Sequence, residues 1–307
     1  MSDIYQKTKG LILVLLGCSL FWQGCNSNNS ATPVPTYIHI DSFHFVSGTV
    51  HPYNLAASTP TLLQNYVLTN SHQTNVAWVY YNDNPVGIFD LPATFPVITN
   101  GTGVLKVFPG VAADGENNDI INYLFYQSDT FTFVPQPGKT IVHEPITTYN
   151  TGDVVGLIAD FENGKSNFGA WGGTPVSMTV VHGDSVFSGF GGSGCIALSA
   201  PNADSTIDSS SFSFAIPSGT AYIEFDYNST VPFYVGLQAN LSNVVSSFPY
   251  YLTGIYPSTG WQKFYLEVDG FTASAQATSY TLFIKANLLP GQTSGRLLLD
   301  NIQLITN

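Results

Sequence analysis

Charged side chains are scarce in this chain, and basic ones are scarcer than acidic ones. Only 9% of the 307 residues are charged, and 8 Lys and Arg stand against 20 Asp and Glu, which gives a formal net charge of −12. Proteins that bind nucleic acids neutralise phosphates with clustered Lys and Arg. The composition therefore excludes nucleic acid as an expected partner, and it argues against docking on anionic lipid through basic patches.

Cysteine is nearly absent, with 3 residues in the chain. Cys18 and Cys25 lie close to the N-terminus, which leaves Cys195 alone in the remainder. If Cys25 carries a covalent lipid, Cys195 has no cysteine left to pair with, and no intrachain disulfide is expected. Its neighbours Ile196–Leu198 indicate a strand, so we interpret Cys195 as a small buried apolar side chain.

Motifs of common enzymes are missing as well. The chain has no Gly-x-Ser-x-Gly and no His-Glu-x-x-His, and the glycine-rich stretch Gly189–Gly194 lacks the Lys and the following helix of a phosphate loop. A glycosidase needs two carboxylates that face each other across a cleft. Strand alternation alone accounts for the spacing of acids such as Glu224 and Asp226, so we do not expect an enzyme.

A sustained 3.6-residue apolar period with caps at both ends is also missing, so no long helix is predicted. Aromatic residues make up 14% of the chain, which also contains 28 Gly and 18 Pro. Aromatic and β-branched strands separated by neutral turn formers are typical of extracellular β-sandwiches, and the turn-forming Asn82–Pro85 predicts a hairpin. The fold class is therefore predicted to be all-β, with two β-sandwiches, since domains of about 100–150 residues are the commonest.

The long apolar run of the chain, Leu11–Trp22, lies near the N-terminus. Lys7 and Lys9 precede it, and the small residue Gly24 stands directly before Cys25. A basic start, a short apolar segment and a small residue at the end are the pattern of a secretory signal. The run is shorter than the roughly 20 apolar residues that a membrane-spanning helix needs.

A small residue before Cys resembles the processing site of bacterial lipoproteins, in which that Cys becomes the lipid-bearing first residue. We predict a signal peptide over residues 1–24, lipidation of Cys25 and a polar tether over residues 25–36. Cys18 is the alternative, because its upstream residues fit the consensus better, although cleavage there would shorten the apolar segment. The resemblance implies attachment to a lipid bilayer at the outer membrane or cell surface; an ordinary cleaved signal and an uncleaved anchor are the other possibilities.

Residues 37–149 are predicted to form an Ig-like β-sandwich from about seven short strands, among them Tyr123–Tyr126. Within this region Trp78–Tyr80, Gly87–Phe89 and Leu91–Val97 resemble the Trp-Val-Tyr, Gly-x-Phe and Leu-Pro-Ala-Thr-x-Pro-Val segments of an uncharacterised N-terminal domain of bacterial surface lipoproteins. That resemblance implies a fold and carries no activity.

Residues 150–156 are predicted to be a linker, and residues 157–307 a second sandwich. This region opens with an Asp-Phe-Glu segment at Asp160, continues with Gly260–Phe264 and closes with Leu299–Ile302. In that order these motifs resemble the jelly rolls of carbohydrate-binding modules. The resemblance covers nearly the whole second half and implies a jelly roll that binds a glycan.

In jelly rolls of that family the first and last strands lie side by side, and their acidic residues commonly hold a structural Ca²⁺. The matching residues are Asp160 and Glu162 on the first strand and Asp300 on the last. Alternation would place Asp160 and Glu162 on one face, and converging carboxylates suit a hard cation. The alternative is that these acids are solvated at the edge of the module.

Sugar recognition by such modules uses exposed aromatic rings beside polar hydrogen-bonding groups. A pyranose offers CH groups to a ring face, while its hydroxyls meet polar side chains. Pro residues near Tyr250 and Tyr256 interrupt strand pairing there and favour display of the rings, whereas Trp261 begins a strand and is expected in the core. The candidates for a glycan-binding patch are Trp171, Phe190, Tyr250, Tyr251 and Tyr256; core packing is the alternative for each of them.

The sequence thus predicts a membrane-anchored extracytoplasmic lipoprotein whose jelly roll binds a glycan or another extracellular polymer without catalysis. A structural or adhesive role, or service as an accessory subunit with a surface protein as partner, is the first alternative. A glycoside hydrolase is the second.

Overall fold

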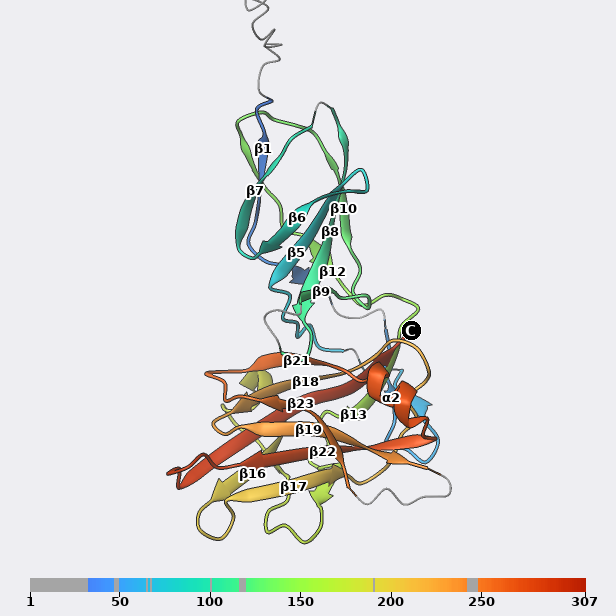
Figure 1. Cartoon of the computed structure of the whole chain (residues 1–307), viewed down its shortest axis with the longest axis vertical. Coiled ribbons are helices and arrows are strands. Elements are labelled where there is room, and N and C mark those ends of the chain that lie inside the picture. Colours follow the sequence, from blue (N-terminus) through green and yellow to red (C-terminus); the bar gives the residue numbers. More distant parts are fainter. Residues whose placement is uncertain are drawn as a thin grey trace, which may run out of the picture.

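The computed structural model describes residues 33–46, 50–64, 66, 68–99, 101–115, 120–189, 191–241 and 248–307. These residues form two stacked β-sandwiches and one short α-helix, α2 (Asp269–Ala275) (Figure 1). The all-β prediction is confirmed. No helix in this described part is long and apolar enough to cross a membrane. The predicted signal peptide, the two candidate lipidation sites Cys18 and Cys25, and the candidate ring Phe190 lie outside the described residues.

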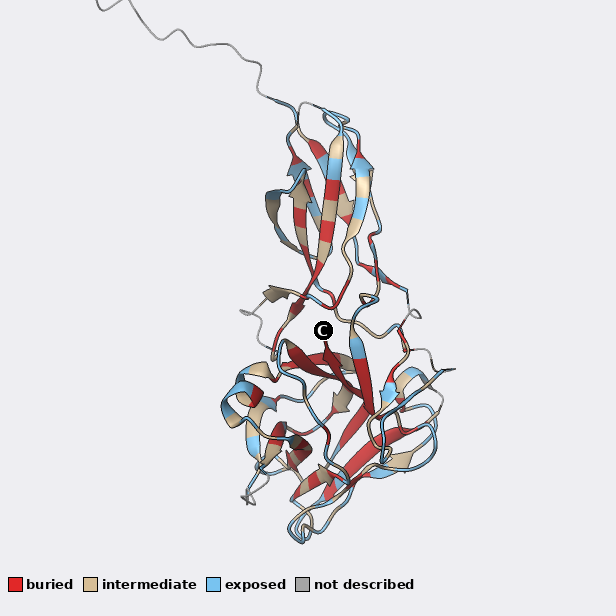
Figure 2. Cartoon of the chain, turned by 90° about the vertical axis from the view of Figure 1, so that its right-hand side faces the viewer, coloured by how far each residue is buried: buried red, intermediate tan, exposed pale blue. Residues whose placement is uncertain are grey.

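The N-terminal sandwich packs two small sheets face to face, with strand orders β11-β1-β7 and β10-β8-β5-β6, and β9 beside β8. Inward side chains such as Ile38, Val79 and Phe95 form its core. Buried and exposed residues alternate along these strands (Figure 2), as expected where one face of each sheet is buried. The strands are β1 (Thr36–Ile40), β5 (Val76–Tyr81), β6 (Asn84–Asp90), β7 (Ala93–Val97), β8 (Gly103–Ala112), β9 (Ile120–Asn122), β10 (Asp129–Phe133) and β11 (Thr140–Val142).

The predicted hairpin is present, because β5 and β6 pair and the turn between them has positive φ at Asn82 (47°) and Asp83 (63°). The predicted strand Tyr123–Tyr126 is wrong. The neighbouring strand β9 ends at Asn122, and the Tyr126 amide donates to the Tyr123 carbonyl in a turn. Aromatic density suggested a strand there, but these rings are buried against the second module instead. The relation of this sandwich to Ig domains stays a prediction.

The C-terminal module is a jelly roll in which the chain alternates between two sheets. One sheet has the order β14-β17-β22-β19-β20, and the other is built around the 13-residue strand β23, which pairs with β13, β16 and β18. The expected neighbourhood of the first and last strands is confirmed by the β13–β23 pairing. The strands are β13 (Val154–Ala159), β14 (Phe168–Ala170), β15 (Thr179–Val181), β16 (Ser193–Ser199), β17 (Ser205–Ser210), β18 (Ala221–Ser229), β19 (Phe233–Asn240), β20 (Tyr250–Ile255), β21 (Gln262–Glu267), β22 (Ser279–Asn287) and β23 (Ser294–Thr306), with a 3₁₀ turn η1 (Phe187–Gly189).

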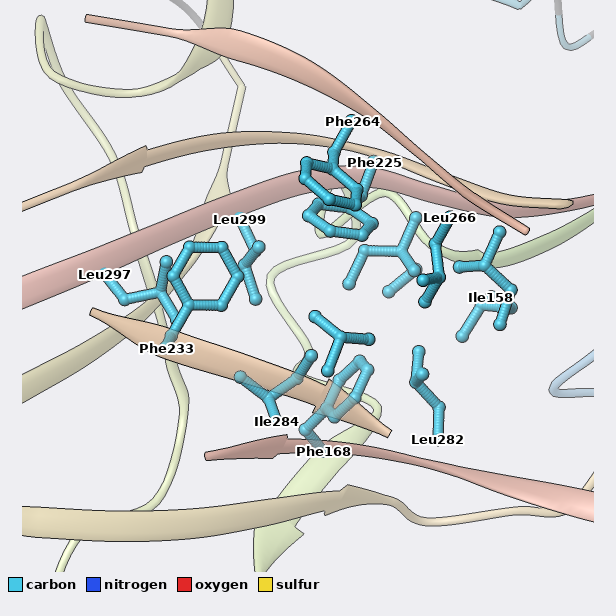
Figure 3. Close-up of a cluster of buried hydrophobic side chains, with 14 of the residues drawn as sticks. Ile158, Phe168, Phe225, Phe233, Phe264, Leu266, Leu282, Ile284, Leu297 and Leu299 are labelled. Atoms are coloured by element: carbon cyan, nitrogen blue, oxygen red, sulfur yellow. The ribbon is translucent and has the colours of Figure 1, made fainter. Parts of the chain in front are cut away.

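The core of the jelly roll lies between its two sheets (Figure 3). Phe225 of β18 stacks on Phe264 of β21 with ring centroids 5.2 Å apart, and aliphatic side chains such as Leu282 and Leu299 fill the space beside them. Burying one such side chain contributes about 1.5–3 kcal/mol. This core fixes which residues of the five-stranded sheet face inward and therefore which face outward.

The two modules are joined by strand pairing as well as by the covalent connection. Residues expected within the first module form β3 (Tyr53–Asn54) and β4 (Thr61–Leu62), and β3 pairs in parallel with β13 of the jelly roll. The end of β8 also reaches the edge strand β21, where Ala113 bridges Tyr265. The short strands β2 (His44–Phe45) and β12 (Ile146–Thr147) pair beside the junction. The boundary is thus shared between the modules, and strand β13 already begins inside the predicted linker.

A buried carboxylate lies at the centre of this junction. The Glu224 side chain is 0% exposed. Its Oε1 accepts from the Tyr123 hydroxyl at 2.5 Å, and its Oε2 accepts from the Tyr149 hydroxyl at 2.6 Å and from the Gln303 amide at 2.7 Å. The Lys263 ammonium lies 3.0 Å from the same Oε2. Burial opposes the charged form of Lys263, but the carboxylates of Glu224 and Asp226 outweigh it and raise the pKa of Lys263.

Candidate functional site

The outer face of the five-stranded sheet β14-β17-β22-β19-β20 gathers aromatic and polar side chains. Along β22, Leu282 and Ile284 belong to the core, so Phe283 and Lys285 between and beside them point outward. Along β19, Val235 is in the core and its neighbour Tyr234 points outward, 39% exposed. We call this surface the outer face.

Strand register places these outward side chains in two adjacent rows. In the first row, Lys285 pairs with Ile207 on one side and with Tyr234 on the other. Trp171 extends this row, because its amide donates to the Ile207 carbonyl at 2.8 Å. In the second row, Gly236 pairs with Phe283 on one side and Tyr251 on the other. Trp171 and Tyr251 therefore lie toward opposite edges of the same face.

Two glycines permit close contacts on this face, one with a ring and the other with the backbone of the neighbouring strand. A Cβ on Gly254 would lie 2.9 Å from the ring of Tyr234, so the missing side chain makes room for that ring. A Cβ on Gly236 would lie 2.5 Å from the Tyr250 carbonyl oxygen, beside the bulge between Val235 and Gly236. A bulge re-aims the side chains next to it, here those of β20.

The rings on the outer face are partly supported and partly free. Trp171 packs edge-on against Phe283 with ring centroids 5.5 Å apart, and Phe283 is 1% exposed beneath it. On the other side Trp171 lies 6.4 Å from the ring of Phe248, which is 72% exposed. The support holds Trp171 in one orientation, while the half-buried ring keeps an accessible surface.

A single ammonium group lies between the two tyrosines. The Lys285 Nζ is 5.9 Å from the ring centroids of both Tyr234 and Tyr251, within cation–π range. Burial raises the pKa of Tyr251, whose buried hydroxyl has no hydrogen-bond partner among the described residues. An unsatisfied buried hydroxyl of this kind is costly, and it would gain a bond from a ligand that reached it.

Amide and hydroxyl groups continue the outer face beyond the rings. The Asn240 amide donates to the Thr281 hydroxyl at 3.1 Å, and Gln238 pairs with Thr281 in the strand register. Ser209 stands in the row of Phe283. Such groups both donate and accept hydrogen bonds, so the outer face can bind neutral hydroxyls next to its rings.

The structure places two of the predicted ring candidates, Trp171 and Tyr251, on the same face. It places Tyr250, 61% exposed, against Phe271 of α2, where the rings stack 5.2 Å apart away from the outer face. Tyr256, 83% exposed, follows β20 and lines a cavity at the junction of the modules. Sequence reasoning missed Tyr234 and Lys285. Tyr234 and Lys285 alternate with the apolar Val235 and Ile284, which indicates that they point to the opposite face of the sheet. The alternation does not show which of the two faces packs against the other sheet.

The predicted calcium ligands are arranged differently from the expectation. Strand β13 ends at Ala159, so Asp160 and Glu162 lie in the following loop, and Phe161 between them has φ of 57° and a buried ring. The strand alternation on which the expected common face rested is therefore absent at these residues. Within the described residues no three His, Cys, Asp or Glu side chains form a cluster that could hold a metal ion. Calcium binding stays a prediction.

Asp300 is the buried member of that set. Its Oδ2 accepts from the Ser193 hydroxyl at 2.6 Å, and its Oδ1 accepts from the Asn301 amide at 2.8 Å. Burial raises the pKa of Asp300 to about 7, and the negative charges of Asp226 and Glu162 act in the same direction.

Comparison with known proteins gives only remote similarities. No protein-family model and no curated protein matches the chain. Solved structures that resemble part of it include a family 61 carbohydrate-binding module in complex with β-1,4-galactotriose (10% identity over 48% of this chain and 97% of the other, TM-score 0.34). A family 30 carbohydrate-binding module (11% identity, 49% and 98%, TM-score 0.38) and a family 11 module from Clostridium thermocellum in complex with a mixed-linked tetrasaccharide (18% identity, 49% and 94%, TM-score 0.35) also match. TM-scores of this size leave the function to be argued from the chain's own side chains.

Proposed function

We propose that the outer face of the jelly roll binds a neutral extracellular glycan without chemical conversion. The observation that carries this proposal is the pair of adjacent rows in which Trp171, Tyr234 and Tyr251 stand beside amide and hydroxyl groups. Ring faces contact the CH groups of a pyranose, and the polar side chains meet its hydroxyls. The rows cross several strands, which suits an extended sugar chain.

The arrangement of the modules supports a surface-anchored role. Residues 33–36, the first that the structure describes, lie at the end of the N-terminal sandwich opposite the jelly roll (Figure 1). With lipid on Cys25, or on Cys18, the sandwich would stand between the bilayer and the outer face. The glycan-binding module would then be the part farthest from the membrane. Mass spectrometry of the mature N-terminus tests both cleavage and lipidation.

Affinity electrophoresis through gels that contain soluble β-glucan, galactan, xylan or galactomannan tests the glycan proposal. Replacing Tyr251 or Trp171 by Ala should lower affinity by about 2- to 10-fold for each ring, since ring contacts contribute about 0.5–1.5 kcal/mol beyond buried area. Tyr250→Ala is the matched control, because Tyr250 is adjacent in sequence but stacks on Phe271. Equal losses for Tyr250 and Tyr251, or no retardation of the wild type, would reject the proposal.

Calcium is a subsidiary proposal for the region of Asp160, Glu162 and Asp300. The pKa of Tyr66 is raised, first by burial and then by these three carboxylates together with Asp226, so all four negative charges act on the same hydroxyl. A hard cation would relieve the repulsion. Thermal unfolding with and without a chelator tests this, because an ion bound by the folded state raises the midpoint. An unchanged midpoint would reject the ion.

A further inference from the structure

The junction of the two modules contains a cavity that lies beside the buried carboxylate network and shares Lys263 with it. It has a volume of about 620 Å³ and is lined from the N-terminal sandwich by the beginning of β5 and the ends of β6 and β8, and from the jelly roll by β21 and the segment after β20. A second hollow of about 570 Å³ adjoins it and shares the lining residues Gln73, Asn75 and Lys263. Ligand sites in proteins typically measure about 300–1,000 Å³. We call the first of these cavities the junction cleft.

The walls of the junction cleft are held in place by hydrogen bonds between the modules. The Gln73 backbone amide donates to the Tyr265 hydroxyl at 2.9 Å, and the Lys263 amide donates to the Gln73 side-chain oxygen at 3.0 Å. On the opposite side, the Asp114 amide donates to the Tyr265 carbonyl at 2.9 Å, and the Glu267 amide donates to the Asp114 carboxylate at 2.9 Å. A preformed site loses little conformational entropy when a ligand binds.

The charges of the junction cleft exclude an anionic ligand. Lys263 is the basic residue of its lining, and its ammonium group is engaged by Glu224 at 3.0 Å in the buried network. Asp90 adds an exposed carboxylate to the wall. A phosphate, a sulfate or a uronate would therefore meet negative charge without an available cation.

The groups that remain available are a ring and neutral or acceptor polar groups. The ring of Tyr256 is 83% exposed and makes no contact with another ring of the described chain. Asn75, Tyr227 and Asp90 also line the cavity, and the structure shows no side-chain hydrogen bond for these three among the described residues. Together they offer one apolar ring face, donors and acceptors.

We propose that the junction cleft is a second binding site, for a neutral oligosaccharide of about two or three sugar units. Tyr256 stacks on one sugar ring, and Asn75, Tyr227 and Asp90 bind its hydroxyls. The site is separate from the outer face, because Tyr256 and Asp90 lie at the junction and Tyr251 lies on the outer face. Bound sugar contacts both modules at once and so stabilises their relative orientation.

The test is saturation-transfer NMR on the purified protein with a mixture of neutral di- and trisaccharides from cellulose, β-1,3-glucan, xylan, mannan, galactan and starch. Tyr256→Ala and Asp90→Asn should each weaken binding of the saccharide that gives a signal with the wild type, by about 5-fold or more. Because both side chains are exposed, neither change should disturb folding. Tyr37→Ala and Asp83→Asn, at exposed positions of the N-terminal sandwich outside the cleft, are the matched controls. Trp171→Ala, on the outer face, serves as a second background, in which adding Tyr256→Ala should lower the remaining signal by the same factor as in the wild type.

Each outcome assigns the two sites separately. Loss of signal with the cleft variants, both alone and in the Trp171→Ala background, supports the junction cleft. Loss of signal with Trp171→Ala, without loss in the cleft variants, overturns the proposal of a cleft site and leaves the outer face as the sugar site. The absence of any signal from the wild type also overturns the proposed cleft site. The proposed site on the outer face is tested separately, by retardation in gels that contain a polysaccharide.

Discussion

The junction between the modules and the outer face of the jelly roll both concentrate tyrosines, but they bury them to different extents. Tyr123 is 0% exposed and Tyr265 is 2% exposed in the junction, whereas Tyr234 is 39% exposed on the outer face. The junction hydroxyls bond to Glu224 or to each other, whereas the Tyr251 hydroxyl has no partner within the described chain. Burial and pairing, more than residue type, therefore separate a structural cluster from a recognition surface.

The lysines of the two regions show the same difference. The side chain of Lys263 is 3% exposed and forms an ion pair with Glu224. Lys285 is half-buried between two tyrosine rings, and no carboxylate within salt-bridge distance is recorded for it in the described residues. Removing Lys263 should therefore affect stability, and removing Lys285 should affect binding.

The largest expected effect follows from breaking the buried ion pair of the junction. Lys263→Met leaves the Glu224 carboxylate buried without its cation, and such changes cost about 3–5 kcal/mol. Urea denaturation should show this loss in the free energy of unfolding. Lys106→Met removes an exposed ion pair with Asp83 and should cost at most about 1 kcal/mol.

A second change distinguishes loss of charge from loss of packing. Adding Glu224→Gln to Lys263→Met removes the uncompensated carboxylate and should recover part of the stability. If Lys263→Met alone costs no more than Lys106→Met, the network does not fix the junction in the way described.

An intermediate effect is expected from pH, through Asp300 near the junction. The ordinary pKa of 3.8 is raised to about 7 by burial, so between about pH 4 and pH 7 the folded chain binds more protons than the unfolded chain. The free energy of unfolding should therefore decrease as pH rises through this window, by about 1–3 kcal/mol. Burial also raises the pKa of Asp153 to about 7, which adds to the same trend.

Asp300→Asn separates the contribution of Asp300 from that of Asp153, because the Asn amide cannot ionise. Denaturation at pH 5 and pH 8 should give a smaller difference for Asp300→Asn than for the wild type. Asp83→Asn, at an exposed position, should leave the difference unchanged. A wild-type protein that becomes more stable between pH 5 and pH 8 would contradict the assignment.

The strands of the fold were largely predictable because alternation and turn chemistry are local. The hairpin at Asn82 and Asp83 follows from residues that tolerate positive φ. The segment Tyr123–Tyr126 could not be assigned correctly, because its burial depends on a partner more than 100 residues away, Glu224. For the same reason the strand β3 was not foreseen as part of the jelly-roll sheet.

The candidate site was predictable only in part. Trp171 and Tyr251 were identified from aromatic residues near turns, but Tyr250 and Tyr256 were grouped with them although their rings lie elsewhere. Strand register determines which rings share a face, and a bulge between Val235 and Gly236 shifts that register. A one-residue shift reverses the direction of every following side chain, so the sequence pattern alone could not group the rings.

The smallest expected effect concerns Lys285, the counterpart of Lys263 on the outer face. Lys285→Met should lower the free energy of unfolding by at most about 1 kcal/mol, the worth of its cation–π contacts. Its ammonium holds the rings of Tyr234 and Tyr251 by cation–π contacts worth about 0.5–1 kcal/mol, so affinity for a neutral glycan should fall by about 2- to 5-fold. Because the glycan is neutral, gel retardation should not depend on salt concentration. Complete loss of binding, or strong salt dependence, would show instead that Lys285 pairs with an acidic group of the ligand.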